Sequence, residues 1–305
     1  MLLHVRHETL YHYTPAVENA QHALHLRPGN SPSQTVLQHA MHISPQPAQQ
    51  REATDGYGNS KLFFSLQTSH DELQVIADSV VQTQASTAPI DALAWERISE
   101  TFRYRAGADY NSAWEFVFAS PYVPRHEAFA DFAKSSFTPC RPLLEAVREL
   151  MSRIHSAMSY DDESTDVDTP ALVALQQGRG VCQDFAHIMV ACCRAMGLPA
   201  RYVSGYMLTQ PAPGHPRLIG CDASHAWASV YCPNASDEKS VSSTGQWFDF
   251  DPTNNRTPSE DYVTLATGRD FLDVSPLRGV IRGGAQHTLD VAVTVTPMQS
   301  AAELI

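Results

Sequence analysis

Hydrophobic and polar residues alternate along short segments of the first third of the chain. Leu2–His7 and Val36–Ile43 alternate, and Thr9–Tyr13 carries aromatic and β-branched residues. Further strands are expected at Ala23–Arg27, Lys61–Ser65 and Leu73–Val81. Alternation with a period of two gives a strand one apolar face, and the runs Pro28-Gly29-Asn30 and Asp55-Gly56-Tyr57-Gly58-Asn59 supply turns between strands. The pattern predicts an N-terminal antiparallel β-sandwich-like domain over residues 1–85.

The pattern changes over the next segment, residues 86–141, which is predicted to be a mostly helical connector. It is punctuated by prolines at Pro89, Pro121, Pro124 and Pro139. Pro142 then suits the first turn of a helix, where its missing N–H costs nothing. The apolar residues after it recur every three or four positions, at Leu143, Val147, Leu150 and Ile154. This spacing predicts one buried helix face at the start of a third domain, residues 142–305.

The rest of this third domain mixes helices with strands. Helices are expected from Pro170 to Gln176 and over Cys182–Met196, the second ended by Gly197-Leu198-Pro199. Strands are expected at Arg201–Met207, Ala226–Cys232, Gln246–Asp251 and Leu289–Val295. The polar, Ser-rich segment 233–245 is expected to be an exposed hairpin loop. The whole chain is therefore predicted to be α+β.

Composition narrows the classes of function. The 305 residues include 21 Lys and Arg and 33 Asp and Glu, a net charge of −12, so a nucleic-acid partner is not expected. No apolar run is long enough for a membrane-spanning helix, and the first residues lack the apolar region of a signal peptide. The six cysteines are irregularly spaced, which favours a reducing, cytoplasmic location over a disulfide framework. Nothing in the composition indicates the oligomeric state.

Three residues in separate segments have the types and local settings of a thiol nucleophile, its base and the group that orients the base. Cys182 begins a helix after the run Gly178-Arg179-Gly180-Val181, and unpaired N–H groups at a helix start favour a thiolate. His225 begins a strand, and Asp251 ends one. The glycines Gly178 and Gly180 let the backbone come close to a substrate. These residues predict nucleophilic catalysis through cysteine.

Other residues could take these roles. Asp249 lies two residues before Asp251, so both face the same side of a strand and either could bond His225, with Asp251 preferred. His187 points away from Cys182 on the helix and is a poor base for it. Cys192 and Cys193 lie in mid-helix and are expected to be packing residues. A zinc site is disfavoured because no CxxC or HxxxH pair is present, and no metal or cofactor is predicted.

These segments resemble the transglutaminase-like superfamily of papain-type cysteine enzymes. The similar motifs are Gly180-Val181-Cys182-Gln183-Asp184-Phe185-Ala186, Asp222-Ala223-Ser224-His225-Ala226-Trp227 and Trp247 to Asp251-Pro252-Thr253. Pro199-Ala200-Arg201-Tyr202-Val203, Gly268-Arg269-Asp270-Phe271 and the N-terminal segment resemble the bacterial branch. The resemblance implies a papain-like core, in which the cysteine helix packs on an antiparallel sheet that carries His225 and Asp251.

The resemblance also implies acyl transfer through a thioester, with a peptide or protein as substrate. Water as acceptor makes the chain a protease or amidase of peptide or isopeptide bonds, which is the expected function. An amine as acceptor makes it a transglutaminase. The third hypothesis is a non-catalytic peptide-binding module. Some family members complete the oxyanion hole with a side chain upstream of the cysteine. Gln176, Gln177 and Tyr160 are the candidates here, with Gly180 in the same substrate loop.

Overall fold

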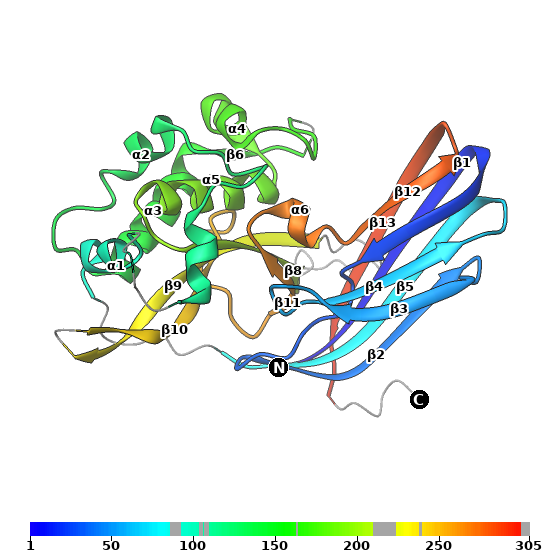
Figure 1. Ribbon diagram of the computed structural model, residues 1–305, viewed down its shortest axis with the longest axis horizontal. Helices are drawn as coiled ribbons and strands as arrows, with labels where there is room; N and C mark the ends of the chain where they lie inside the picture. Colours follow the sequence, from blue (N-terminus) through cyan, green and yellow to red (C-terminus); the bar gives the residue numbers. More distant parts are fainter. Residues whose placement is uncertain are drawn as a thin grey trace, which may run out of the picture.

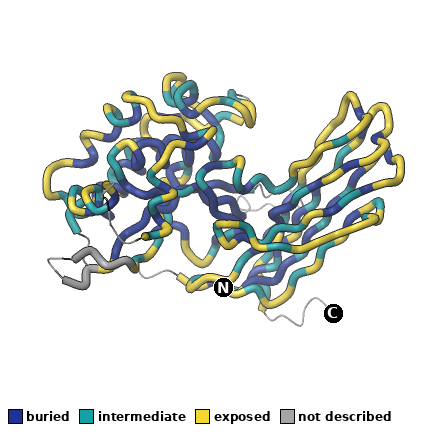
Figure 2. The backbone as a smooth tube through the Cα atoms, viewed as in Figure 1, coloured by how far each residue is buried: buried dark blue, intermediate teal, exposed yellow. Residues whose placement is uncertain are grey.

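The computed structural model describes residues 1–85, 93–103, 106, 110–162, 164–209, 224–237 and 240–299, with the backbone alone for 235–237 and 240–243. Pro89, Asp222 and Ala223, which were named above, lie outside these residues. Helices and a small sheet form one half of the molecule, and a larger sheet forms the other half (Figure 1). Buried residues form a separate core in each half (Figure 2).

The larger sheet is antiparallel and is organised by one long strand, β1 (Leu2–Leu24). The first half of β1 pairs with β5 (His70–Thr83), and its second half pairs with β4 (Ser60–Leu66). The register shifts between His12 and Val17, where β1 passes from one partner to the other. The outer strands are β2 (Gln34–Ser44), beside β5, and β3 (Gln49–Thr54), beside β4. The sheet is thus curled around the buried faces of its strands, as the N-terminal alternation predicts.

The last two strands of the chain belong to this same sheet. They are β12 (Leu277–Gly283) and β13 (Gln286–Pro297), and both pair antiparallel with β1. The predicted domain 142–305 therefore extends too far, because its final strand lies in the N-terminal sheet. Alternation along Leu289–Val295 identifies a strand, but a period of two carries no information about which sheet the strand joins.

The smaller sheet has the strand order β10-β9-β8-β11. Its strands are β8 (Ala200–Met207), β9 (Ser224–Asp237), β10 (Ser240–Phe250) and β11 (Tyr262–Gly268). The cysteine helix α5 (Cys182–Ala195) packs on β8 and β9, beside α3 (Leu143–Ala157) and α4 (Ala171–Gln177). The connector contributes α1 (Trp95–Thr101), the 3₁₀ helix η1 (Ser112–Val117) and α2 (Glu127–Ala133). This arrangement is the α+β core that the resemblance implies.

The segment 233–245 was expected to be an exposed hairpin loop, and the hairpin is present, but paired strands occupy most of the segment that was expected to be loop. Strands β9 and β10 continue through most of it as a β-hairpin, in which Pro233 pairs with Gly245 and Ala235 with Val241. Antiparallel strands pair through their backbone N–H and C=O groups, so a hairpin can form here although the side chains show no apolar pattern. The polar composition was therefore a poor guide to the backbone structure.

Side-chain amides of the N-terminal domain cover the exposed edge of the smaller sheet. Gln34 bonds both the N–H and the C=O of Thr264 on edge strand β11, at 2.7 and 2.8 Å. Asn59 does the same to Thr267, at 2.8 Å for each bond. Each amide replaces the backbone of a missing neighbouring strand, which satisfies the edge and holds the two halves together.

Candidate active site

Cys182 is the first residue of α5 and is partly exposed. The chain reaches it from α4, which ends at Gly178 in the left-handed conformation with a φ of 66°. Arg179–Gly180 then forms the two-residue strand β7, which pairs in parallel with β6 (Ser159–Tyr160). This short pairing fixes the loop before the helix, so the thiol is held at a defined place.

Asp184 fixes the start of the same helix. Its Oδ2 accepts hydrogen bonds from the backbone N–H of Val181 at 2.8 Å and from Oγ1 of Thr165 at 2.7 Å. A Cβ on Gly180 would lie 2.5 Å from this carboxylate, so a larger residue does not fit there. Asp184 accepts the N–H of Val181. The N–H groups of Cys182 and Gln183, in the first turn, have no acceptor within the helix and point toward its N-terminal end, where the thiol lies. The sequence motif thus has a local structural reason at each position.

His225 lies between Cys182 and Asp251 in one chain of contacts. Its Nε2 donates a hydrogen bond to Oδ2 of Asp251 at 2.7 Å, and the Cys182 side chain is close enough to act on the pKa of the imidazole. His225 is 9% exposed and Asp251 is fully buried. The three residues proposed from separate segments are therefore neighbours in the fold.

The Asp251 carboxylate accepts four hydrogen bonds besides the one from His225. The N–H groups of Thr253 and Asn254 bond Oδ1 at 2.9 and 3.2 Å. Asn254 Nδ2 and the Tyr262 hydroxyl each donate to Oδ2 at 2.7 Å. The sequence interpretation missed Asn254 and Tyr262. Asn254 follows Asp251 in a turn and could have been found from that spacing, whereas Tyr262 is on another strand and had no local signal.

These contacts set the charges of the pair. Burial alone would lower the pKa of His225, but the hydrogen bond to Asp251 and the electrostatic interactions with Cys182 and Asp251 raise it to about 10. Burial acts to raise the pKa of Asp251, and the bonds from His225, Asn254 and Tyr262 outweigh it, so this pKa is lowered. The arrangement favours an imidazolium beside a carboxylate.

Asp249 lies on the same face of the strand but does not contact His225. Its polar neighbours are Ser229, Arg201 and Trp227, and burial raises its pKa against their opposing effects. The two aspartates that strand alternation left equivalent are thus distinguished by the fold: Asp251 bonds the histidine and Asp249 faces the N-terminal domain.

The candidate side-chain donors to the oxyanion, which lie upstream of Cys182, differ in their position relative to the thiol. Gln176 is exposed near the end of α4, and within the described residues no hydrogen bond links it to Cys182. Tyr160 pairs with Gly180 and is 58% exposed. Its pKa is raised by partial burial and then by the nearby charge of Cys182. Tyr160 is therefore the candidate beside the thiol, while Gly180 shapes the loop without a side chain.

The remaining histidine and cysteines of α5 are structural. His187 is fully buried, its ring packs tilted against Tyr202 with ring centres 4.8 Å apart, and its Nε2 accepts the N–H of Phe271. Burial lowers its pKa to about 3, so it is neutral. Cys192 and Cys193 are fully buried and their pKa values are raised by burial. These side chains pack the helix against the sheet.

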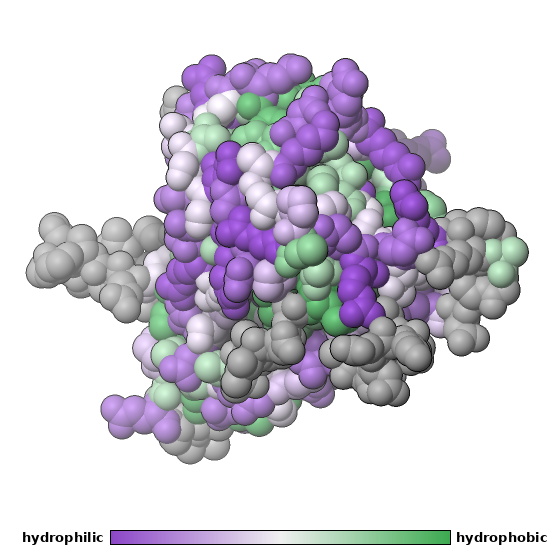
Figure 3. Space-filling view, turned by 90° about the vertical axis from the view of Figure 1, so that its left-hand side faces the viewer, coloured by the Kyte–Doolittle hydropathy of each residue, from purple (hydrophilic) through white to green (hydrophobic). Residues whose placement is uncertain are grey.

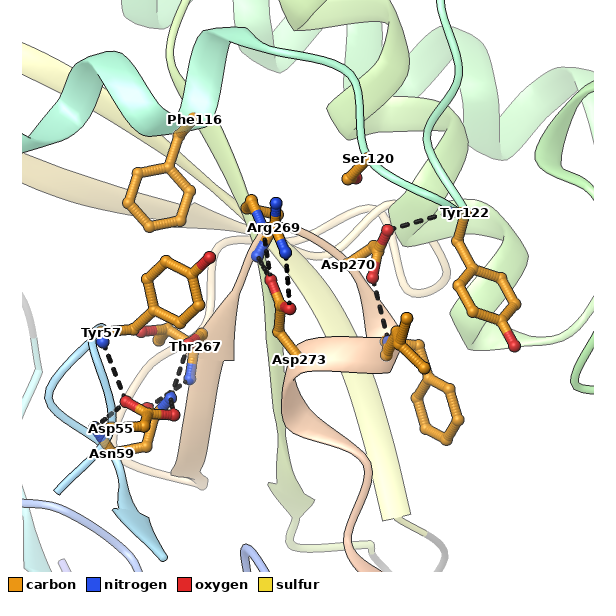
Figure 4. Close-up of polar contacts among 12 residues, drawn as sticks. Asp55, Tyr57, Asn59, Phe116, Ser120, Tyr122, Thr267, Arg269, Asp270 and Asp273 are labelled. Atoms are coloured by element: carbon orange, nitrogen blue, oxygen red, sulfur yellow. Dashed lines mark hydrogen bonds and ion pairs between the residues drawn. The ribbon is translucent and has the colours of Figure 1, made fainter. Parts of the chain in front are cut away.

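The motif Gly268-Arg269-Asp270-Phe271 connects β11 to the short helix α6 (Phe271–Val274) (Figure 4). Arg269 forms two hydrogen bonds to Asp273, at 2.8 and 3.0 Å. Asp270 is buried and accepts the N–H groups of Tyr122 and Leu272. The motif thus ties the connector and α6 to the edge of the sheet and has a structural role here.

The described residues contain no group of three or more His, Cys, Asp or Glu side chains placed to hold a metal ion. Among the helices of the described part, none has the length and apolar character needed to cross a membrane. The helical end of the molecule presents a mostly hydrophilic face with smaller hydrophobic areas (Figure 3).

Fold and site together define a class, the papain-like cysteine fold, and comparison with known sequences names the family. The sequence model of the transglutaminase-like superfamily matches residues 130–252, and that of the bacterial transglutaminase-like N-terminal region matches residues 3–82. The chain belongs to the transglutaminase-like superfamily, with the N-terminal region of its bacterial members.

Similar proteins are found in mycobacteria. Uncharacterized proteins of Mycobacterium bovis and Mycobacterium tuberculosis are each 36% identical over 304 residues, covering 98% of this chain and 93% of the relative. A crystal structure of a candidate cysteine protease from Cytophaga hutchinsonii aligns with a TM-score of 0.73 at 20% identity, covering 98% of this chain and 91% of the other. This likeness shows that the fold extends over both halves of the chain.

Proposed function

We propose that the chain is a cysteine-dependent hydrolase of peptide or isopeptide bonds. The observation that supports this most is the buried hydrogen bond from His225 to Asp251, with Cys182 close enough to act on the pKa of the imidazole. The raised pKa of His225 favours the imidazolium, the form that can protonate a leaving amine. The reaction is acyl transfer, the chemistry of a thiol nucleophile with a positioned base.

In the first step, the Cys182 thiolate attacks the carbonyl carbon of the scissile amide and forms a C–S bond. The carbonyl oxygen becomes an oxyanion, which the N–H groups of Cys182 and Gln183 at the helix start are placed to stabilise. Tyr160 is the side-chain donor that we propose for the same oxygen. The C–N bond then breaks, and the His225 imidazolium gives its proton to the departing amine.

In the second step, His225 accepts a proton from water as the water oxygen attacks the thioester carbon. The C–S bond breaks, the product leaves as a carboxylic acid, and Cys182 returns as the thiolate. Asp251 remains ionised throughout and holds the imidazole in position. An amine in place of water would give the transglutaminase reaction on the same acyl-enzyme.

The proposal is tested first by the reactivity of the thiol toward iodoacetamide at slightly acidic pH, followed by peptide mass spectrometry. Cys182 should be alkylated faster than Cys140, although Cys140 is the more exposed of the two. The advantage of Cys182 should disappear in His225→Ala. Equal rates in the wild type would contradict the proposed thiolate and imidazolium pair.

Turnover is tested with 4-nitrophenyl acetate and with fluorescein-labelled casein, with Cys140→Ala as the matched control for Cys182→Ala. Cys182→Ala should lose both the burst of nitrophenol release and the cleavage of casein. Cys140→Ala should keep both activities. Adding dansylcadaverine separates the two acceptors: incorporation of the amine in place of cleavage would assign a transglutaminase. Activity that survives Cys182→Ala would overturn the proposed mechanism.

A further inference from the structure

Two charged side chains flank a serine on the face of the smaller sheet that points away from α5. Arg201 on β8 and Asp249 on β10 both pair with Ser229 on β9, so the three residues form one row across the sheet. Their chain neighbours Ala200 and Phe248 pack in the core with α5. Because side chains alternate along a strand, the row points toward the N-terminal domain.

A cavity of about 600 Å³ lies over this row. Its other wall is formed by residues 29–34 and 57–59 of the N-terminal domain, together with Gln84. Arg201 and Asp249 are the charged residues among those that line it. The volume is in the range of small-molecule sites, which are often formed between domains.

The Arg201 guanidinium is held in place but not neutralised. It lies over the Trp247 ring, 4.2 Å from the ring centre. Its Nε is buried, and among the described residues this atom has no hydrogen-bond partner. Burial lowers the pKa of Arg201 to about 10, against an opposing effect from Asp249. A partly buried cation that forms no ion pair with the described residues carries a desolvation cost that a ligand carboxylate would offset.

Asp249 is the complementary case. Burial raises its pKa despite the neighbouring Ser229, Arg201 and Trp227. Ser229 lies between the two charged residues and is fully buried, and Asp249 forms no ion pair with Arg201 in the described structure. The amides of Gln34 and Asn59 in the same lining are already used by β11. The cavity thus offers one cation and one anion to a ligand.

We propose that this interdomain cavity binds a small zwitterion, an amino acid or a short peptide. Its carboxylate pairs with the Arg201 guanidinium in the two-bond geometry that arginine favours, and its ammonium group pairs with Asp249. The apolar part of the ligand lies against Trp247. The site is separate from Cys182 and stands whether or not the proposed hydrolysis is correct.

The test is isothermal titration calorimetry of the full chain with L-alanine and with triglycine. Propionate and propylamine, which carry only one of the two charges, are titrated in parallel. At least one zwitterion should bind saturably, and both single-charge compounds should bind more weakly. Arg201→Gln and Asp249→Asn should each weaken zwitterion binding by about tenfold or more, the effect of losing a charged hydrogen bond.

Matched controls separate this site from others. Arg282→Gln removes an exposed positive charge on β12 and should leave binding unchanged, as should Cys182→Ala. Arg201→Lys keeps the charge and should bind with intermediate affinity, and it replaces Arg201→Gln if that variant does not fold. The proposal is overturned by absent saturable binding, by equal binding of the single-charge compounds, or by binding that is lost in Cys182→Ala but kept in Arg201→Gln.

Discussion

Asp249 and Asp251 lie two residues apart at the end of β10 and on the same face of the sheet, yet their surroundings are opposite. Asp251 is enclosed by the turn that follows it and by Tyr262 of β11, and it accepts five hydrogen bonds. Asp249 faces the interdomain cavity, and burial raises its pKa, whereas the pKa of Asp251 is lowered. Two identical side chains on one strand therefore have different acid strengths.

The difference shows what a buried carboxylate needs in order to stay charged. Burial opposes ionisation at both positions, and only directed donors reverse that effect. At Asp251 the donors come from His225, Asn254 and Tyr262, which belong to three separate segments. At Asp249 no comparable set is present. We expect the first region to orient a base and the second to accept a ligand.

The largest effect expected from this comparison is on catalysis. Asp251→Asn should lower kcat/KM for 4-nitrophenyl acetate by about 10²–10⁴-fold, because the amide keeps the shape but does not hold the imidazolium. Asp249→Asn should cause a loss smaller by about tenfold or more. Equal losses in the two variants would remove the functional distinction between the two aspartates.

The next effect is on stability and is measured by urea unfolding. Asp251→Ala leaves the Tyr262 hydroxyl, the Asn254 amide and the imidazole without their acceptor. We expect a cost of about 3–5 kcal/mol in the free energy of unfolding. Asp249→Ala should cost less than half of that, since fewer donors lose a partner. A larger loss for Asp249→Ala would contradict the hydrogen-bond geometry at Asp251.

A single donor to Asp251 should have a smaller effect. Tyr262→Phe removes one 2.7 Å hydrogen bond to Oδ2 and should reduce kcat by about 3–30-fold, with KM little changed. Tyr262 is a positioning residue, so the pH profile of kcat should shift as well. Tyr206→Phe is the matched control, because it loses a buried bond to His7 on another part of the sheet. A uniform drop in both variants would indicate general destabilisation.

The last effect is the pH dependence of stability. The pKa of His225 is raised in the folded chain, so its contribution is fully present below about pH 6.5, the ordinary value for histidine, and is lost as the pH rises through about 10. The stability difference between the wild type and His225→Gln should therefore shrink from pH 6.5 to pH 10, as measured by urea unfolding at several pH values. A difference that stays constant over this range would show that the pKa of the imidazole is not raised in the folded chain.

Local sequence patterns were sufficient to predict most helices and strands and to place two residues of the candidate site, Cys182 and His225. The glycines before Cys182 and the strand that follows His225 are local signals, and the structure places both residues where these signals indicate. The sequence also identified β2, β4 and β5 of the N-terminal domain, but it divided the single strand β1 into three segments and missed β3. Hydrophobic periodicity depends on neighbours a few residues apart, so one sequence contains it in full.

Tertiary structure alone decided the contacts between distant segments. Strand alternation puts Asp249 and Asp251 on the same face, and only the approach of His225, Asn254 and Tyr262 distinguishes them. In the same way, Leu289–Val295 reads as a strand, but its place beside β1 depends on a partner almost the whole chain away. Pairing partners and buried hydrogen bonds are properties of the packed molecule, because they are set by which surfaces meet and not by the spacing of residues along the chain.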